Sequence, residues 1–197
     1  MRLIVLIPLA LIIVSTGWAV ITFNRLVRGR NQLKEGWSGI DVQLKRRRDL
    51  VPNLVAVVKA YQKHEQELLE NVTRHRSEAA AASTIDSTRS AEGQLSADLG
   101  RLLMLAESYP DLKADSQFRE LGSNLVKIED DLQYARRYYN GSVRDLNNLV
   151  ESFPNNLIAA IGGFKTADYF ELENAAAGLT PDLGKLLSST TSESETA

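Results

Sequence analysis

Side chains that could act as nucleophiles, bases or metal ligands are scarce in this chain. It has no cysteine and only two histidines, His64 and His75. A di-iron site in a helical bundle needs a glutamate three residues before each histidine, but Tyr61 and Val72 occupy those positions. A zinc-protease helix needs a second histidine four residues after the first, and that position is Leu68. We therefore expect no catalytic residue, no metal, no cofactor and no small-molecule substrate, and we place both histidines on helix surfaces.

Two charged clusters remain. The carboxylates at 129–131 are predicted to form a solvated helix face rather than an acid/base pair. The basic run at 45–48 has three interpretations: a helix C-terminus with some arginines paired inside the domain, a contact with a partner protein, or a site for anionic lipid or nucleic acid. A net charge of -2 and a pI near 5.8 disfavour nucleic acid, which we do not expect as a partner.

The first residues must be placed in a membrane. Residues 3–24 carry no charge and lie between Arg2 and Arg25. As a helix they would span about 33 Å, against about 30 Å for the hydrocarbon core of a bilayer. Trp18 and Phe23 lie toward the far end, where interfacial aromatic residues are common. The stretch is longer than the apolar part of a signal peptide, so we predict an uncleaved single-pass anchor in the lipid bilayer. A cleaved signal peptide and a buried core helix are the alternatives.

Basic residues predict the orientation of this anchor. Arg2 and the amino terminus precede the apolar stretch, whereas four basic residues follow it closely: Arg25, Arg28, Arg30 and Lys34. The positive-inside rule therefore places the larger, carboxyl-terminal part in the cytoplasm. The rule is weaker where a folded domain follows the anchor, so the opposite orientation, with this part outside the cytoplasm, is the alternative.

The remainder has the periodicity of amphipathic helices. One apolar stripe runs from Leu26 to Leu44, with Gly36 and Gly39 allowing close approach of another backbone. Asp49 is expected to cap a second helix with Pro52 in its first turn. The apolar stripe of this second helix runs on through residues 54–82, and the small polar residues 83–91 are expected to form a loop.

Two further helices are predicted beyond this loop. The third opens at Leu95 and ends before Pro110. The fourth is capped by Asp115 or Ser116 and has the most regular apolar spacing in the chain, running toward Phe153. Three tyrosines near its middle are predicted to pack inside the bundle: Tyr134, Tyr138 and Tyr139. The fold class is therefore all-α, with an N-terminal transmembrane helix continuing into an antiparallel helical bundle of about four long helices.

The carboxyl-terminal part changes in character. Residues 156–164, NLIAAIGGF, are apolar but too short to cross a bilayer. They are expected to fold back onto the bundle, or alternatively to form a patch that docks a partner or touches the membrane. We predict an anchor at 1–24, a helical bundle domain at 25–173, and a small, polar, disordered tail at 174–197.

Four blocks of this sequence carry a family resemblance. They are GWSGIDVQLKRRRDLVPNLV, RLLMLAESYPDLKADSQFREL, ARRYYNGSVRDLNNLVESFPNNLIA and GFKTADYFE. In this order they resemble the LemA family of bacterial membrane proteins, over residues 23 to 171. The resemblance implies a non-enzymatic helical bundle anchored at its N-terminus in the bacterial inner membrane. The family is also similar to a magnetosome protein, which implies membrane organisation, and some members are linked to membrane metalloproteases.

Two functional hypotheses follow. The first is a single-pass membrane-anchored helical scaffold that self-associates, as a homo-oligomer, to organise or remodel membrane. The alternative is an adaptor or regulator that binds a membrane protease or envelope complex, which would make a membrane protein its partner. Asp41 and the arginines could instead form an internal ion pair. The candidate partner or assembly contacts are Trp37, Asp41, Arg46, Arg47, Asp49, Pro52, Asn53, Pro154, Asn156, Leu157, Ile158 and Phe164.

Overall fold

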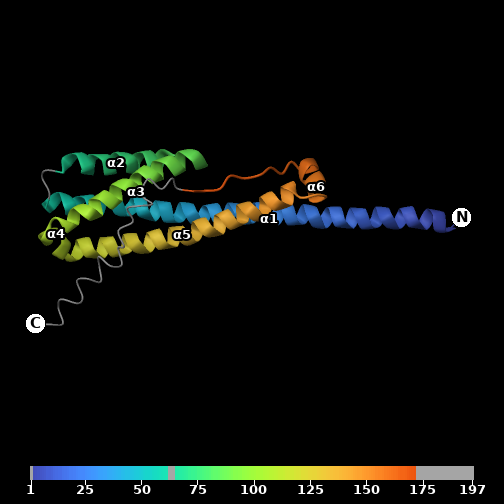
Figure 1. Ribbon diagram of the computed structural model, residues 1–197, viewed down its shortest axis with the longest axis horizontal. Coiled ribbons are helices and arrows are strands. Elements are labelled where there is room, and N and C mark those ends of the chain that lie inside the picture. Colours follow the sequence, from blue (N-terminus) through green and yellow to red (C-terminus); the bar gives the residue numbers. More distant parts are fainter. Residues whose placement is uncertain (1, 62–64, 172–197) are drawn as a thin grey trace, which may run out of the picture. The chain divides into compact units, whose positions relative to one another are not determined.

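The computed structural model describes residues 2–61 and 65–171 and builds them from helices, with no strand among them (Figure 1). The all-α prediction is confirmed. The predicted tail at 174–197 and His64 lie outside the described residues. The helices are α1 (Arg2–Tyr61), α2 (Gln66–Ala81), α3 (Ile85–Glu107), α4 (Pro110–Ala114), α5 (Ser116–Glu151) and α6 (Asn155–Ile161).

Helix α1 runs without a break through Asp49 and Pro52, so the prediction of a new helix capped at Asp49 is wrong. A proline inside a helix removes the hydrogen bond to the carbonyl four residues earlier, which here belongs to Arg48. That carbonyl accepts a hydrogen bond from Nε of Arg76 at 2.8 Å. A donor from α2 therefore replaces the one that Pro52 lacks, and α1 continues.

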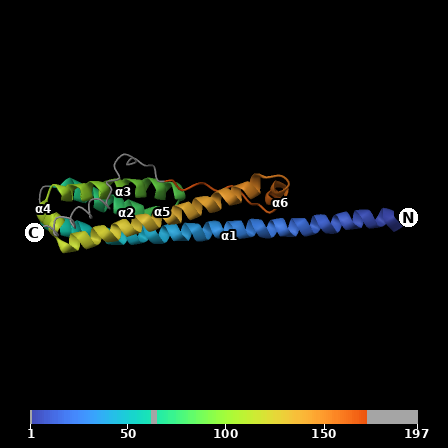
Figure 2. The same ribbon diagram turned by 60° about the horizontal axis from the view of Figure 1, so that its bottom comes forward.

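Helices α2 and α3 form an antiparallel hairpin and lie side by side in both views (Figures 1 and 2). Their connection is short, because α3 already begins at Ile85. The predicted loop at 83–91 is therefore wrong. The hydroxyl of Thr84 accepts a hydrogen bond from Ser87 N at 3.2 Å, and the hydroxyl of Ser87 accepts one from Thr84 N at 3.0 Å. This reciprocal capping box satisfies two of the free N–H groups that begin α3.

The start of α5 follows the prediction. Tyr109 precedes α4 in an extended conformation, with Pro110 in the first turn of that helix. Asp115 then caps α5, because its Oδ1 accepts a hydrogen bond from Phe118 N at 2.8 Å. A carboxylate at this position also interacts favourably with the positive end of the helix dipole.

The described residues divide into two compact units. We call residues 2–40 with 134–170 the anchor unit, and residues 41–61, 65–133 and 171 the bundle unit. The bundle unit has a continuous apolar core built from α1, α2, α3, α4 and α5. Its buried members are Val51, Leu54, Val57, Val58, Leu69, Val72, Ala79, Leu95, Leu99, Leu102, Leu103, Ala106, Leu112, Phe118 and Leu125.

The anchor unit has a smaller core where α6 folds back beside α1, as both views show (Figures 1 and 2). Its buried members are Leu26, Leu146, Ala159 and Phe164. Residues 156–164 do fold back, through the face that carries Ala159 and Phe164, but they pack on α1 and α5 of the anchor unit and not on the bundle unit. Helix α1 also holds an 18-residue window with a mean hydropathy of 2.2 that is only 6% buried. Its first part is thus long and apolar enough to cross a membrane.

Candidate functional site

The basic run of α1 places one guanidinium at the centre of the bundle unit. Arg47 is fully buried and donates to Glu92 Oε2 and Glu129 Oε1, each at 2.6 Å. It also donates to the hydroxyl of Ser96 at 2.6 Å and to the backbone carbonyl of Glu92 at 3.2 Å. Burial opposes the charge of Arg47, but the charges of Glu129 and Glu92 and the hydrogen bonds to both outweigh it and raise its pKa above the ordinary value. Arg47 is therefore a permanent structural cation.

The neighbouring basic residues differ in environment. Arg48 Nη1 donates to Glu92 Oε1 at 2.7 Å, so arginines hold both oxygens of that carboxylate. Asp41 Oδ1 lies 3.9 Å from Arg48 Nη2 and is largely exposed. Arg46 Nη1 lies 3.8 Å from Asp131 Oδ2, and both of these side chains are exposed.

Two of the predictions for charged residues need correction. The basic run is not at a helix C-terminus, because α1 continues to Tyr61. Pairing inside the domain holds for Arg47 and Arg48. The carboxylates at 129–131 do not all face solvent, since Glu129 is half-buried and bonded to Arg47.

Trp37 is packed inside the anchor unit. Its ring makes edge-to-face contacts with Tyr139 at 5.6 Å and with Phe170 at 5.4 Å between centroids. Gly36 brings α1 close to α5, because a Cβ added to it would lie 3.0 Å from the Cα of Tyr139. This confirms the expectation that Gly36 permits close backbone approach.

Sequence reasoning missed the side chains that hold the segment after α6 against α5. Asn140 accepts from Phe170 N at 2.9 Å and donates to Phe170 O at 3.2 Å. Asn147 makes the same pair of hydrogen bonds with Ala167, at 2.8 and 3.0 Å. Asparagine is a poor helix former, so the occurrence of asparagines inside the long helix α5 was the available signal, although it does not single out Asn140 and Asn147.

Two of the tyrosines predicted to pack inside the bundle are exposed instead. Tyr139 is buried and donates to the carbonyl of Asp168 at 3.0 Å. Tyr134 and Tyr138, one turn apart on α5, are 67% and 50% exposed. The guanidinium of Arg137 lies 4.5 Å from the ring centroid of Tyr134. We call Tyr134 and Tyr138 the tyrosine face.

An apolar surface lies where α5 passes into α6. Phe153, Leu157 and Ile161 are exposed there, and we call these three residues the apolar tip. The opposite side of α6 packs inward through the half-buried Ile158 and the buried Ala159. The three apolar residues therefore contribute little to the core of the anchor unit.

Polar and aromatic contacts tie the same segment to α1. The hydroxyl of Thr22 donates to Asn155 Oδ1 at 3.5 Å, and the rings of Phe23 and Phe164 meet edge-to-face at 5.6 Å. Asn156 Oδ1 is buried with no hydrogen-bond partner. Pro154 is exposed at the start of the segment.

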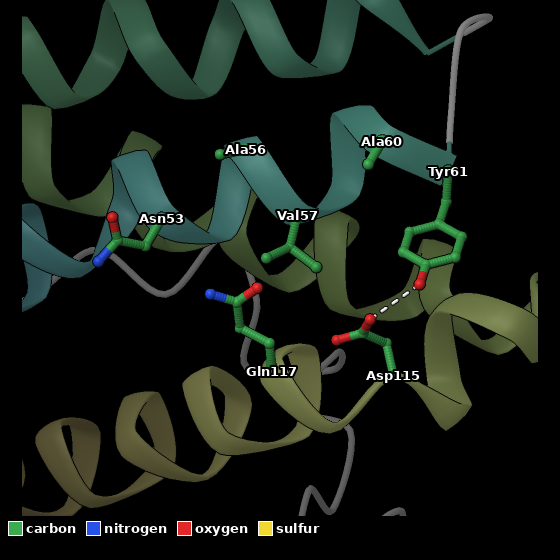
Figure 3. Close-up of a pocket in the computed structure, with 7 residues that line it drawn as sticks. All are labelled: Asn53, Ala56, Val57, Ala60, Tyr61, Asp115 and Gln117. Atoms are coloured by element: carbon green, nitrogen blue, oxygen red, sulfur yellow. Dashed lines mark hydrogen bonds between the residues drawn. The ribbon is translucent and has the colours of Figure 1, made fainter.

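An open hollow of about 330 Å³ lies at the end of the bundle unit (Figure 3). Asn53 lines it, whereas Asp49 and Pro52 are exposed on α1 but are not among its lining residues. The hydroxyl of Tyr61 donates to Asp115 Oδ2 at 2.8 Å. The hydrogen bonds from Phe118 N and Tyr61 lower the pKa of Asp115, and the hydrogen bond to Asp115 raises the pKa of Tyr61.

The structure distributes the predicted contact residues over both units. Trp37, Pro154, Asn156, Leu157, Ile158 and Phe164 belong to the anchor unit, and Asp41, Arg46, Arg47, Asp49, Pro52 and Asn53 to the bundle unit. Their role as contacts stays a prediction.

Within the described ranges, no group of three or more His, Asp or Glu side chains could hold a metal ion. The expectation that His75 lies on a helix surface is wrong. It is half-buried, and its Nδ1 lies 2.5 Å from Asp98 Oδ2.

Comparison with known proteins decides the family. Residues 36–183 match the sequence profile of the LemA family. The chain belongs to the LemA family. This match includes the buried Arg47, the tyrosine face and the apolar tip.

Curated relatives of this LemA-family chain are similar over parts of their length. Protein LemA of Metamycoplasma hominis is 28% identical over 138 residues, which are 69% of this chain and 63% of that protein. Magnetosome protein MamQ 2 of Paramagnetospirillum magneticum is 34% identical over 91 residues, 46% of this chain and 33% of the relative. Magnetosome protein MamQ of Magnetospirillum gryphiswaldense is 32% identical over 91 residues, with the same coverage. The chain thus spans about a third of the length of the magnetosome relatives. The apolar helix and these relatives together indicate a membrane-associated helical protein.

Proposed function

We propose that this LemA-family chain is a membrane-anchored scaffold that self-associates to organise or remodel membrane. The observation that carries self-association is the tyrosine face, Tyr134 and Tyr138, exposed one turn apart on the long helix α5. Tyrosine and arginine are enriched in protein interfaces, because a large ring gains contact area while its hydroxyl remains hydrogen-bonded. Arg137 beside Tyr134 adds a cation to the same surface. The similarity to magnetosome proteins supports a role in membrane organisation.

Anchoring makes such a surface effective even when each contact is weak. Confinement to a bilayer raises the local concentration of the chain, so that weak contacts combine into an assembly. The apolar part of α1 supplies the anchor. We propose that it lies in the bacterial inner membrane with the bundle in the cytoplasm, as the basic residues after it suggest. Protease protection of a C-terminal tag in spheroplasts tests this side directly, since digestion of the tag would place the bundle outside.

The double variant Tyr134→Ser with Tyr138→Ser tests self-association. Purified full-length chain in nanodiscs or mild detergent is analysed by light scattering over a concentration series. Loss of interface aromatic residues costs about 2 kcal/mol or more at a hot spot, or roughly 30-fold in association. The variant should therefore dissociate at concentrations where the parent chain remains oligomeric.

Met104→Ser is the matched control, because Met104 is an exposed apolar residue of α3 in the bundle unit. It should leave the oligomer unchanged, and circular dichroism should show that both variants are folded. A parent chain that is monomeric throughout would refute the scaffold proposal. Crosslinking in the native membrane then tests the adaptor alternative, which predicts one dominant foreign partner in place of self-adducts.

A further inference from the structure

The apolar tip has no partner within the anchor unit. Phe153, Leu157 and Ile161 are 79%, 55% and 85% exposed. Leu157 and Ile161 are four residues apart in α6 and therefore lie on one face. The other face already fills the small core through Ala159 and Ile158. Three large apolar side chains on so short a segment form a surface that water solvates unfavourably.

Contacts with α1 fix the level of this tip relative to the anchor. Thr22 and Phe23 belong to the last turn of the uncharged stretch, which ends at residue 24. Thr22 meets Asn155, the first residue of α6, and Phe23 meets Phe164, just after it. An apolar helix of about 33 Å fills a hydrocarbon core of about 30 Å. Wherever this stretch leaves the bilayer, the tip is therefore beside it.

Charges near the tip suit a lipid headgroup layer. Arg25, Arg28 and Arg30 follow the uncharged stretch on α1, and Lys165 follows α6. The guanidinium of Arg30 lies 5.1 Å from the ring centroid of Phe164. Within residues 151–165, Glu151 is the single acidic residue. Basic side chains at this level favour anionic headgroups, and apolar side chains favour the acyl chains below them.

From this arrangement we propose that Phe153, Leu157 and Ile161 enter the lipid bilayer at its interface, beside the anchor helix. The chain thus contacts the membrane twice, first through α1 and again through α6. A second contact fixes the rotation of the anchor unit about α1, and it adds bulk to one leaflet. The proposal rests on the membrane anchor of the proposed function but not on self-association.

The absence of cysteine makes the test direct, since one introduced cysteine carries one label. Leu157→Cys and, separately, Ile161→Cys are labelled with an environment-sensitive fluorophore. Each full-length protein is reconstituted into phosphatidylcholine–phosphatidylglycerol vesicles, with and without lipids that carry a nitroxide quencher, one near the top of the acyl chain for the interface and one near its end for the bilayer centre. Circular dichroism checks that each labelled protein is folded.

Two further positions serve as references. Val14→Cys lies in the exposed apolar part of α1, and Lys34→Cys lies on its exposed surface beyond the basic residues. We expect the labels at Leu157 and Ile161 to lose most of their emission to the nitroxide near the top of the acyl chain, and the label at Val14 to lose it to the nitroxide near the end of the chain. The label at Lys34 should keep its emission.

Each other outcome overturns the proposal in a distinguishable way. Labels at the tip that behave like Lys34, while Val14 is quenched, would show an anchor without a second contact. Tip labels with blue-shifted emission that nitroxide lipid does not quench would show that protein, such as a second copy, covers the tip. An unquenched label at Val14 would remove the anchor itself, and with it the proposed function.

Discussion

Replacing Arg47 by methionine removes the cation around which the bundle unit is built, while keeping an unbranched side chain of similar reach. Glu92 would then be left fully buried with Arg48 as its remaining cation. Glu129 is less affected, because its side chain is 32% exposed and can turn toward water. The hydroxyl of Ser96 would lose its partner as well.

The size of the effect follows from burial. Breaking a buried ion pair by removing one partner costs about 3–5 kcal/mol. That range applies as an upper bound here, because the buried charge of Glu92 keeps one of its two cations, Arg48. In a protein of this size each kcal/mol lowers the unfolding temperature by about 2–4 °C. We therefore expect Arg47→Met to lower the unfolding temperature by up to roughly 6–20 °C.

Thermal unfolding of full-length protein in detergent, followed by circular dichroism, measures this shift. Arg46→Met is the matched control, since it makes the same replacement one residue earlier. Its nearest carboxylate is Asp131 at 3.8 Å, and the two side chains are 61% and 53% exposed. An exposed pair of this kind contributes about 0.2–1 kcal/mol, so Arg46→Met should unfold close to the parent.

A double variant tests whether the loss of stability in Arg47→Met arises from the buried carboxylate of Glu92, which has lost one of its cations. Glu92→Gln keeps the shape of the side chain but removes its charge. Combined with Arg47→Met, it should cost less than the two single changes added together, with a coupling of about 0.5–3 kcal/mol. If Arg47→Met is no more destabilising than Arg46→Met, or the double variant is simply additive, the reasoning about the buried network is refuted.

Two further predictions concern other parts of the chain. Gly36→Ala should destabilise the protein by about 1–3 kcal/mol in the same unfolding assay, because the new Cβ would lie 3.0 Å from the Cα of Tyr139. Gly141→Ala is its control: a Cβ there meets nothing within 4 Å, so it should stabilise helix α5 by about 0.4–1 kcal/mol, and a loss of stability there would contradict the packing argument. Since the folded pKa of Tyr61 is raised, its stabilising bond to Asp115 should persist up to the ordinary tyrosine pKa of 10.0 and be lost as pH rises further. The absorbance change that Tyr61→Phe removes should therefore appear above that pH. Since the folded pKa of Asp115 is lowered, its contribution should be present above the ordinary value of 3.8 and be lost as pH falls below it, and Asp115→Asn should abolish that acid-side dependence.

The long helices were predictable because their apolar stripes continue over many turns. The stripe of α5 from Phe118 to Tyr139 is regular, so both its helicity and its buried face follow from spacing. The exposure of two tyrosines on the same helix could not be predicted from spacing in this way. Tyr134 and Tyr138 are aromatic and were expected to be buried, but their exposure depends on how the other helices pack, which spacing along α5 does not reveal.

The helix ends were harder to predict because short-range chemistry has more than one outcome. Polar residues at 83–91 suit a loop and equally suit a capping box followed by an exposed first turn, which is what Thr84 and Ser87 form. Pro52 is tolerated inside α1 because Arg76, distant in sequence, donates to the carbonyl that the proline leaves free. Such long-range replacements carry no local signature.

The position of α1 at the start of the chain has a consequence for how the protein is made. Gly36 packs on Tyr139, which the ribosome adds roughly a hundred residues later, or on the order of 5–20 s at ordinary rates of translation. During this interval the apolar stripe of α1 that follows the uncharged stretch cannot pack against α5, which has not yet been synthesised. The residues that close the anchor unit, up to Phe170, come later still. Folding of this unit therefore has to wait until the chain has been synthesised at least to Phe170.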